Sequence, residues 1–349
     1  MTEDFARRTS LRVTFDGTDI TEDITPYLLS ASFTDNEEDL TDDFTLTLQD
    51  RDGIWLTAWL ADAMNAAAAS RKIRAWIIRH NWNGDSRDEE LPCGEFELDE
   101  AGVSGPPMTV TLRSTSLPYA EQIRQTVHSR EWENYNLFAI ADEIAGSAGM
   151  LAVPPSSGKN PEYERVEQYE ESDIVFLSRL CKEAGISLKS TDGMLVMVDQ
   201  AEYEAKDSIK TVRFGDGSYI KFRLSTGERD SQYSSCVVAY YDLESGNIYT
   251  GTAKNADAKN EQVLTHVAAV SSNAEAEELA GNMLRQKNKF EKTAQFTFPG
   301  NPSLCACMPL TLEGFGAWDG KYIIKKAVHS ISGTGGYTTQ VTLRKGLEA

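Results

Sequence analysis

The sequence contains no long apolar run, few cysteines and too few basic residues to balance its acids. No stretch approaches the roughly 18 to 20 apolar residues that cross a bilayer, and the first residues lack the continuous apolar core of a secretion signal. These absences predict a chain that is made in a cytoplasm and does not insert into a membrane.

Cysteine is scarce and irregularly spaced. The 349 residues contain five cysteines, which are scattered apart from one Cys-x-Cys at Cys305 and Cys307. An odd, scattered set is neither a disulfide framework nor a usual zinc spacing. We therefore expect reduced thiols that are mostly buried.

Positive charge is also in short supply. Lys and Arg together number 34 against 54 Asp and Glu, which gives a formal net charge of −20. A protein that holds nucleic-acid phosphates needs clustered Lys and Arg to displace counterions, so DNA binding is excluded as a main activity. The like charge would instead let DNA pass without adhering.

The residues that are present indicate a folded protein of more than one domain. Hydrophobic residues make up 40% of the chain and aromatic residues 9%, which is typical of soluble globular proteins. The length allows two or three domains, each with its own core.

Both ends of the chain show β patterning. Apolar and polar residues alternate over Leu11–Gly17 and Asp42–Asp50, as they do in half-buried strands. The stretch 53–70 changes to helical spacing before the strand pattern returns. From Val212 the β pattern resumes, and a capping box at Ser272 predicts one further helix.

The middle of the chain has a different pattern. Helical spacing predicts helices over 116–129 and 134–150, and a Pro-, Ser- and acid-rich stretch at 153–172 is interpreted as a surface linker. A third helix is predicted over 173–185, followed by a hairpin that turns at Asp192-Gly193.

Two distant segments share one pattern. Gly94–Arg113 and Gly320–Arg344 each contain a glycine, an alternating strand with an aromatic residue, a Gly-rich corner and a final Val-Thr-Leu-Arg. We interpret them as copies of a duplicated β-barrel unit that flank the helical section.

The sequence therefore predicts a mainly β fold with α+β inserts, in which two similar, tube-like β-barrel domains accompany a helical section and a small α+β domain. The predicted boundaries are 1–117 for the first barrel with an inserted helix, 118–152 for the helical section, 153–211 for the linker and small α+β domain, and 212–349 for the second barrel with an inserted helix.

Possible chemical sites have simpler structural explanations. His329 lies within a predicted strand without a nearby Asp, Ser or Cys partner, which favours a structural role. Cys305, Cys307 and His329 offer three soft ligands, but a usual zinc site needs a fourth ligand and a wider Cys spacing. We expect no metal, no cofactor and no catalytic residue.

Two further motifs fail their context tests. The glycines of 314–320 have strands on both sides and no helix after them, so a nucleotide loop is not supported. The acidic run Asp35–Asp43 lacks the mid-loop glycine and closing glutamate of a calcium-binding EF-hand loop, so a calcium site is not supported.

The C-terminal third resembles the late control protein D family, the baseplate hub proteins of contractile phage tails. Earlier signatures occur in the same order, including a helix that opens near Trp132. One departure is the sequence Cys-Ala-Cys-Met at 305–308, where family members commonly have a glycine. The residues that carry the likeness are Gly94, Phe96, Gly105, Pro106, Phe176, Leu177, Gly300, Pro302, Gly314, Gly316, Gly320, Tyr322, His329, Tyr337 and Thr339.

The resemblance implies a structural role without enzymatic activity. Such hubs, which are related to the hub half of type VI secretion spike proteins, look like homotrimers whose paired barrels form a pseudo-sixfold ring between a hexameric tail tube and a trimeric spike. The implied partners are a tail-tube or tube-initiator protein and a separate spike protein, with tape-measure and baseplate wedge proteins as further candidates. DNA would pass through without specific binding. The implied location is the baseplate of a virion tail, or of a bacteriocin or injection particle, after assembly in the host cytoplasm.

Two other classes of function remain open at this point. One is a baseplate-associated cell-wall hydrolase, although the predicted domains leave no spare segment of hydrolase size. The other is a monomeric ligand-binding β-barrel protein. Zymography on peptidoglycan tests the first class, and the mass of the protein in solution tests the second.

Overall fold

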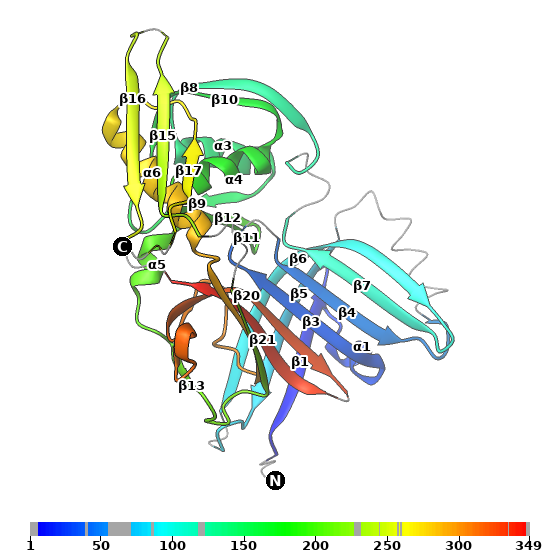
Figure 1. The fold of residues 1–349 in the computed structure, drawn as a ribbon. Coiled ribbons are helices and arrows are strands. Elements are labelled where there is room, and N and C mark those ends of the chain that lie inside the picture. The colour runs from blue at the N-terminus through cyan, green and yellow to red at the C-terminus, as the bar shows by residue number, and fades with distance from the viewer. Residues whose placement is uncertain are drawn as a thin grey trace.

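The computed structural model describes residues 6–38, 41–54, 71–84, 87–117, 123–226, 232–243, 245–256, 258, 260–333 and 335–346. Most of them lie in β-strands (Figure 1). The prediction of a mainly β fold with α+β inserts is confirmed. The helix predicted over 53–70 lies outside the described residues from position 55 onward. No described helix is long and apolar enough to cross a membrane.

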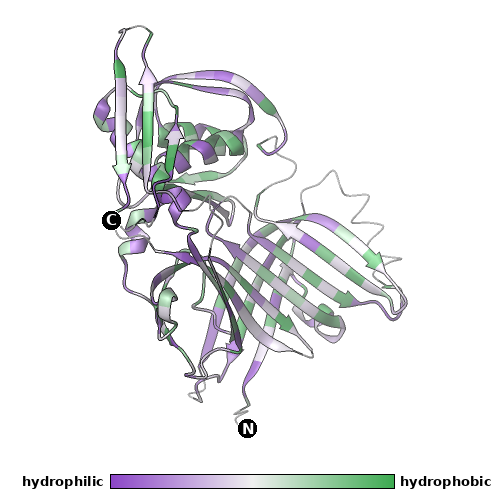
Figure 2. Ribbon diagram, in the orientation of Figure 1, coloured by the Kyte–Doolittle hydropathy of each residue, from purple (hydrophilic) through white to green (hydrophobic). Residues whose placement is uncertain are grey.

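Six strands make up what we call the N-terminal β unit, in the order β3-β4-β7-β6-β5-β1 with every neighbouring pair antiparallel. Alternate residues of β4, namely Phe44, Leu46 and Leu48, point into its core, and Figure 2 shows the alternation along these strands. The elements are β1 (Arg8–Phe15), β2 (Thr18–Asp19), α1 (Thr21–Ile24), η1 (Thr25–Tyr27), β3 (Leu28–Asn36), β4 (Asp43–Gln49), β5 (Lys72–His80), β6 (Asp88–Ser104) and β7 (Thr109–Thr115).

Six later strands make up the C-terminal β unit, in the order β14-β18-β21-β20-β19-β13. Here β13 is parallel to β19, whereas all other pairs are antiparallel. The elements are β13 (Lys210–Arg213), β14 (Lys221–Thr226), β18 (Lys292–Pro299), β19 (Pro309–Glu313), η4 (Gly316–Trp318), β20 (Gly320–Ser332) and β21 (Gly336–Lys345).

The two units repeat one strand order, although β1 runs antiparallel to β5 whereas its equivalent β13 runs parallel to β19. Strands β1, β3, β4, β5, β6 and β7 correspond, in chain order and in pairing, to β13, β14, β18, β19, β20 and β21. Gly94 lies opposite Ala75, and Gly320 lies opposite Leu312 at the matching place. Both long strands then show a register shift, between 98 and 100 in β6 and between 324 and 326 in β20. Equivalent positions in these two strands therefore differ by 226, since 320 − 94 = 226.

This register corrects one detail of the sequence repeat. The Val-Thr-Leu-Arg ends do not superpose, because Ala101 pairs with Leu112 and its equivalent Ala327 pairs with Val341. Leu112 thus corresponds to Val341 rather than to Leu343. The offset is two residues, so the same side chains still face the core.

The two units join into one sheet. Residues 326–332 of β20 pair with 30–36 of β3, and the sheet runs as a path from β14 to β2. Among the described residues this path is open and closes no barrel. The boundaries at 117 and 212 remain predictions.

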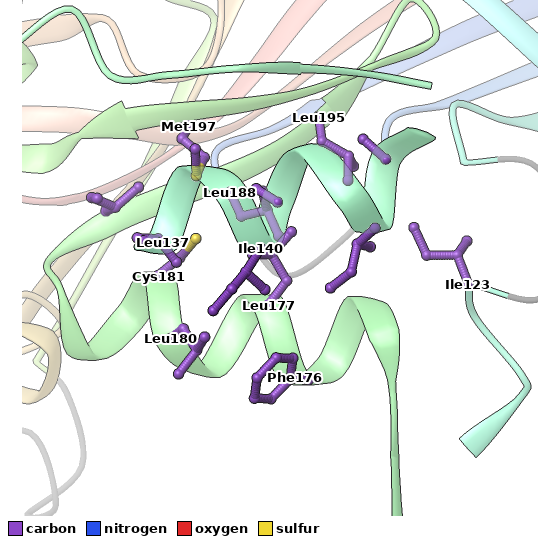
Figure 3. Packing of buried hydrophobic residues seen from close by; sticks show 14 of the residues in the cluster. Ile123, Leu137, Ile140, Phe176, Leu177, Leu180, Cys181, Leu188, Leu195 and Met197 are labelled. Atoms are coloured by element: carbon purple, nitrogen blue, oxygen red, sulfur yellow. The ribbon is translucent and has the colours of Figure 1, made fainter. Parts of the chain in front are cut away.

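The middle of the chain forms an α/β body above the sheet (Figure 1). Helices α3 and α4 lie side by side, and Leu137, Ile140 and Leu177 fill the space between them (Figure 3). Asn136 caps α3 by accepting a hydrogen bond from the Ala139 amide at 2.8 Å. The elements are β8 (Val127–Asn136), α3 (Leu137–Ser147), β9 (Leu151–Val153), β10 (Glu162–Ser172), α4 (Asp173–Glu183), β11 (Ile186–Thr191), β12 (Met194–Asp199) and α5 (Gln200–Ala205).

Two local predictions for this body are wrong. The helix predicted over 116–129 is replaced from Val127 by strand β8, so no helix opens near Trp132, and the predicted linker 153–172 contains strand β10. These strands pair with each other and bury Trp132 and Gln168 on one face. The dense charge of the outer face hid this alternation in the sequence.

A further small sheet lies between β14 and β18 in the chain. Its strand order is β16-β15-β17, and α6 packs against it. The predicted cap of α6 is confirmed, because the Ser272 hydroxyl accepts a hydrogen bond from the Glu275 amide at 3.1 Å. The elements are β15 (Ser235–Tyr241), β16 (Ile248–Lys254), β17 (Val263–His266) and α6 (Asn273–Asn288).

Candidate functional site: the junction of the two β units

The seam between β3 and β20 brings several family-signature residues together. Phe33 of β3 lies opposite His329 of β20, and their rings stack with centroids 6.0 Å apart. Tyr337 and Thr339 of β21 lie on the other side of His329. The signature residues near the C-terminus therefore line the join between the units.

His329 is fully buried and hydrogen-bonded at both ring nitrogens. Nε2 lies 3.1 Å from the Leu304 carbonyl oxygen, which can only accept, so this nitrogen carries the proton. Nδ1 then accepts from the Tyr337 hydroxyl at 2.8 Å. Burial lowers the pKa of His329 to about 4, and the nearby Asp35 carboxylate opposes this only in part. A neutral, fully bonded imidazole is structural, as the sequence predicts.

This environment leads to a prediction about pH. The unfolded chain takes up a proton at His329 near pH 6.5, whereas the folded chain resists protonation down to about pH 4. The stabilisation is therefore complete above pH 6.5 and is lost progressively as the pH falls toward 4, by up to about 1.4 kcal/mol per pH unit. We expect the His329→Gln variant, followed by thermal unfolding from pH 7 to 4.5, to lose less Tm over this range than the parent chain.

The comparison with the parent chain removes the contribution of other groups. Asp42 has the opposite effect on stability as the pH falls, because burial raises its pKa to about 6. It titrates in both proteins, so its effect cancels in the comparison. Identical Tm losses in variant and parent would contradict the assignment of His329.

Gly300 has the closest packing in the junction. A Cβ on this residue would lie 2.0 Å from Cδ1 of Tyr337, so the ring occupies the space of a side chain. The Gly300 carbonyl accepts a hydrogen bond from Nη1 of Arg79, a residue of β5, at 2.6 Å. The following turn holds Pro302, and the Asn301 amide donates to the Thr339 hydroxyl at 2.9 Å. This turn thus fastens one unit to the other.

The remaining signature residues lie elsewhere and serve packing or turns. The pairs Gly94 with Phe96 and Gly320 with Tyr322 occupy equivalent places in β6 and β20, with both rings buried. The turn between β6 and β7 contains Gly105 and Pro106. The turn before β20 contains Gly314 and Gly316, both with positive φ. Phe176 and Leu177 lie in the core of the α/β body.

A buried ionic cluster next to the junction is the feature that sequence reasoning missed. Glu37, in the connection after β3, accepts hydrogen bonds from Arg344 of β21 at Nε (2.9 Å) and Nη2 (2.5 Å). Arg344 also donates through Nη1 to Glu204 of α5 at 2.7 Å. Next to them, Glu38 pairs with Lys289 of the α6 C-terminus. None of these side chains is more than 5% exposed.

A second group extends the cluster toward the α/β body. Lys189 of β11 pairs with Asp35 and Asp42, and its ammonium lies 2.8 Å from Asp42 Oδ2. Asp35 also accepts from the Ala306 amide at 2.7 Å. Four acids of the run 35–43 are therefore buried, namely Asp35, Glu37, Glu38 and Asp42.

The charges within the cluster stabilise one another. Burial raises the pKa of Glu37, but the Arg344 charge and its hydrogen bonds outweigh burial and hold this pKa below its ordinary value. Burial opposes the charge on Arg344, yet the Glu37 carboxylate keeps the pKa of Arg344 well above its usual range. The pair is thus ionised at neutral pH, and its contribution is lost as the pH falls through the folded pKa of Glu37.

The described residues offer no metal centre. They contain no group of three or more His, Cys, Asp or Glu side chains placed to hold an ion, and Cys305, Cys307 and His329 do not form one. Burial raises the pKa of the Cys305 thiol to about 12. The polar residues of this region bind other segments of the chain, which is the chemistry of a connecting structural protein.

Comparison with known proteins places the chain among such structural proteins. Residues 110–335 match the family described as phage tail baseplate hub (GPD), and the chain belongs to this family. The predicted resemblance is confirmed. Membership of a family of baseplate hub proteins also agrees with the prediction that the chain is not an enzyme.

Two curated relatives carry the description "probable baseplate hub protein". The protein of Escherichia phage 186 is 26% identical over 189 residues, which are 53% of this chain and 44% of that protein. The protein of Escherichia phage P2 is 28% identical over 218 residues, which are 60% of this chain and 51% of that protein. The chain thus spans about half the length of the curated relatives it matches.

Solved structures share the fold at low sequence identity. A tail protein from Neisseria meningitidis has a TM-score of 0.70 at 11% identity, over 97% of both chains. The 43 kDa tail protein of prophage MuSo2 from Shewanella oneidensis has a TM-score of 0.67 at 14% identity, over 96% of this chain and 98% of that one. An Escherichia coli component of the type VI secretion system has a TM-score of 0.52 at 11% identity, over 95% of this chain and 76% of that one.

Proposed function

We propose that the protein is the structural baseplate hub of a contractile tail or injection device. Three copies form a ring in which six β units stand around a common channel. A ring of this kind joins a hexameric tail tube to a trimeric spike, because it presents sixfold order through its β units and threefold order through its subunits.

The observation that carries the proposal is the repeat of one six-strand order within one chain. The units already lie side by side in one sheet, joined along β3 and β20. A second copy of the chain, placed beside the first as one unit lies beside the other, continues the row of β units. Family membership supports this use of the repeat.

The partners follow from this role. A tail-tube or tube-initiator protein meets one face of the ring and a separate spike protein meets the other, within the baseplate of a particle assembled in the host cytoplasm. Three chains at −20 each carry a formal −60, and acidic residues that line the channel keep DNA from adhering as it passes.

Imaging of the purified protein, alone and with its tube and spike proteins, tests the proposal. We expect rings of three chains with six similar densities around an open centre. Particles with one density per chain, or a chain that stays single in the presence of both partners, would contradict it. Clearing of peptidoglycan in a zymogram would favour a hydrolase instead.

A further inference from the structure

Of the strand edges that lack a partner strand among the described residues, two have a covered equivalent in the internal repeat. One is the outer edge of β14, which pairs only with β18. The other belongs to residues 99–104 of β6, because β5 pairs with β6 only as far as Glu97 and the Leu98 amide donates to the Arg71 carbonyl. Unpaired edges expose backbone donors and acceptors and are ready sites for another strand.

The internal repeat indicates what covers these edges. In the C-terminal unit, β19 pairs with residues 320–323 of β20, and residues 326–332 pair with β3 of the other unit. The free part of β6 is the equivalent of this second segment. The free edge of β14 is the equivalent of the β3 edge that β20 covers. The equivalents of these two free edges already pair with each other within the chain, as β3 and β20. We therefore expect the two free edges to pair in the same way.

The register of the second seam follows from the first. In the N-terminal unit one row across the strands reads Ala31, Leu46, Leu112, Ala101. In the C-terminal unit the matching row reads Phe222, Phe296, Val341, Ala327. Phe222 thus corresponds to Ala31, so the numbers of equivalent residues in β14 and β3 differ by 191. The numbers of equivalent residues in β20 and β6 differ by 226. The internal pair Ser32 and Ser330 then translates into Arg223 and Ser104, since 32 + 191 = 223 and 330 − 226 = 104.

We propose that β14 of one chain pairs antiparallel with residues 101–104 of β6 in a second copy, with Arg223 opposite Ser104 and Leu224 opposite Val103. This inference rests on the proposed function and specifies how neighbouring subunits meet. The contact is heterologous, because two different edges meet and every subunit keeps one of each for its other neighbour.

Charge disfavours a twofold contact, and apolar surface favours the proposed pairing. Lys221 and Arg223 lie on β14, whereas Asp99 and Glu100 lie at the free edge of β6. Pairing β14 with its own copy would bring like charges together, as would pairing β6 with its own copy. Phe222 is 41% exposed on β14, and the covered seam hides its counterpart Ala31 almost completely. A second copy would bury the exposed part of Phe222.

Disulfide crosslinking between two single variants tests the register. Ser104→Cys and Arg223→Cys chains are mixed under oxidising conditions and separated by mass without reductant. Opposed residues on paired antiparallel strands have Cβ atoms about 5 Å apart, within reach of a disulfide after small shifts. In the internal seam the Ser32 and Ser330 hydroxyls lie 3.5 Å apart, so Ser32→Cys with Ser330→Cys in one chain is the positive control.

The expected result is a shift from the mass of one chain to that of two in the mixture, and no shift in either variant alone. Glu100→Cys mixed with Arg223→Cys is the matched negative control, because residue 100 lies about 13 Å along the strand from residue 104. If rings are seen by imaging but the Ser104→Cys and Arg223→Cys chains give no crosslinked product, the proposed strand pairing is wrong and the proposed ring is retained. A chain that neither assembles nor crosslinks would contradict both proposals.

Discussion

Replacing Arg344 with methionine is expected to lower the free energy of unfolding by about 3–5 kcal/mol, because it leaves buried carboxylates without their counter-charge. Arg344 is fully buried and binds both Glu37 and Glu204. Methionine has a similar volume but no charge. Denaturant unfolding at pH 7 measures the loss, which is a large part of the stability of a typical domain.

A surface arginine provides the matched control. Arg213 pairs with Glu313 at 2.8 Å, and the two side chains are 64% and 49% exposed. Arg213→Met should cost no more than about 1 kcal/mol. If the Arg344→Met chain does not fold, Glu204→Gln removes one partner only and should give a smaller, measurable loss. Equal losses for Arg344→Met and Arg213→Met would show that the buried cluster does not hold the segments together.

The second large effect is expected at Gly251 in β16. A Cβ on this residue would lie 2.1 Å from the backbone carbon of Ala276 in α6, and backbone cannot move aside as a flexible side chain can. Gly251→Ala must therefore push the helix off the sheet. We expect a loss of about 3 kcal/mol, at the upper end for overpacked cores, measured by denaturant unfolding.

Gly281 in the same helix gives the opposite expectation. Apart from the backbone of its own helix, no atom lies within 4 Å of a Cβ placed there, so Gly281→Ala adds helix propensity without a clash. It should raise stability by about 1 kcal/mol. A Gly251→Ala chain as stable as the parent would contradict the close approach of α6 to β16.

The features that were predictable from the sequence depend on short-range patterns. Alternation located most strands of both β units, and helical spacing over 134–150 and 173–185 located α3 and α4. The Gly94 and Gly320 repeat identified equivalent positions correctly, because a glycine followed by an aromatic residue marks the same point in both long strands. The structural role of His329 followed from its missing catalytic partners.

The ionic cluster was not predictable in this way, because its partners are distant in the chain. Glu37 and Arg344 are 307 positions apart, and Glu38 and Lys289 are 251 apart. A run of acids looks the same whether water or a remote cation neutralises it. The strands β8 and β10 were missed for a related reason, since their outer faces carry so many charges that they resemble a linker.

The largest departure of the chain from its own repeat is at one connection. Residues 37–42 form a short link between β3 and β4. The equivalent strands β14 and β18 are linked by residues 227–291, which contain the β15–β17 sheet and α6. In Figure 1 this insert and the α/β body lie at the same end of the strands. A closed assembly of three chains would therefore alternate a short loop with a whole subdomain around the rim at this end of the strands. The neighbour on that side would meet three equally spaced subdomains, which can fix its rotation relative to the ring.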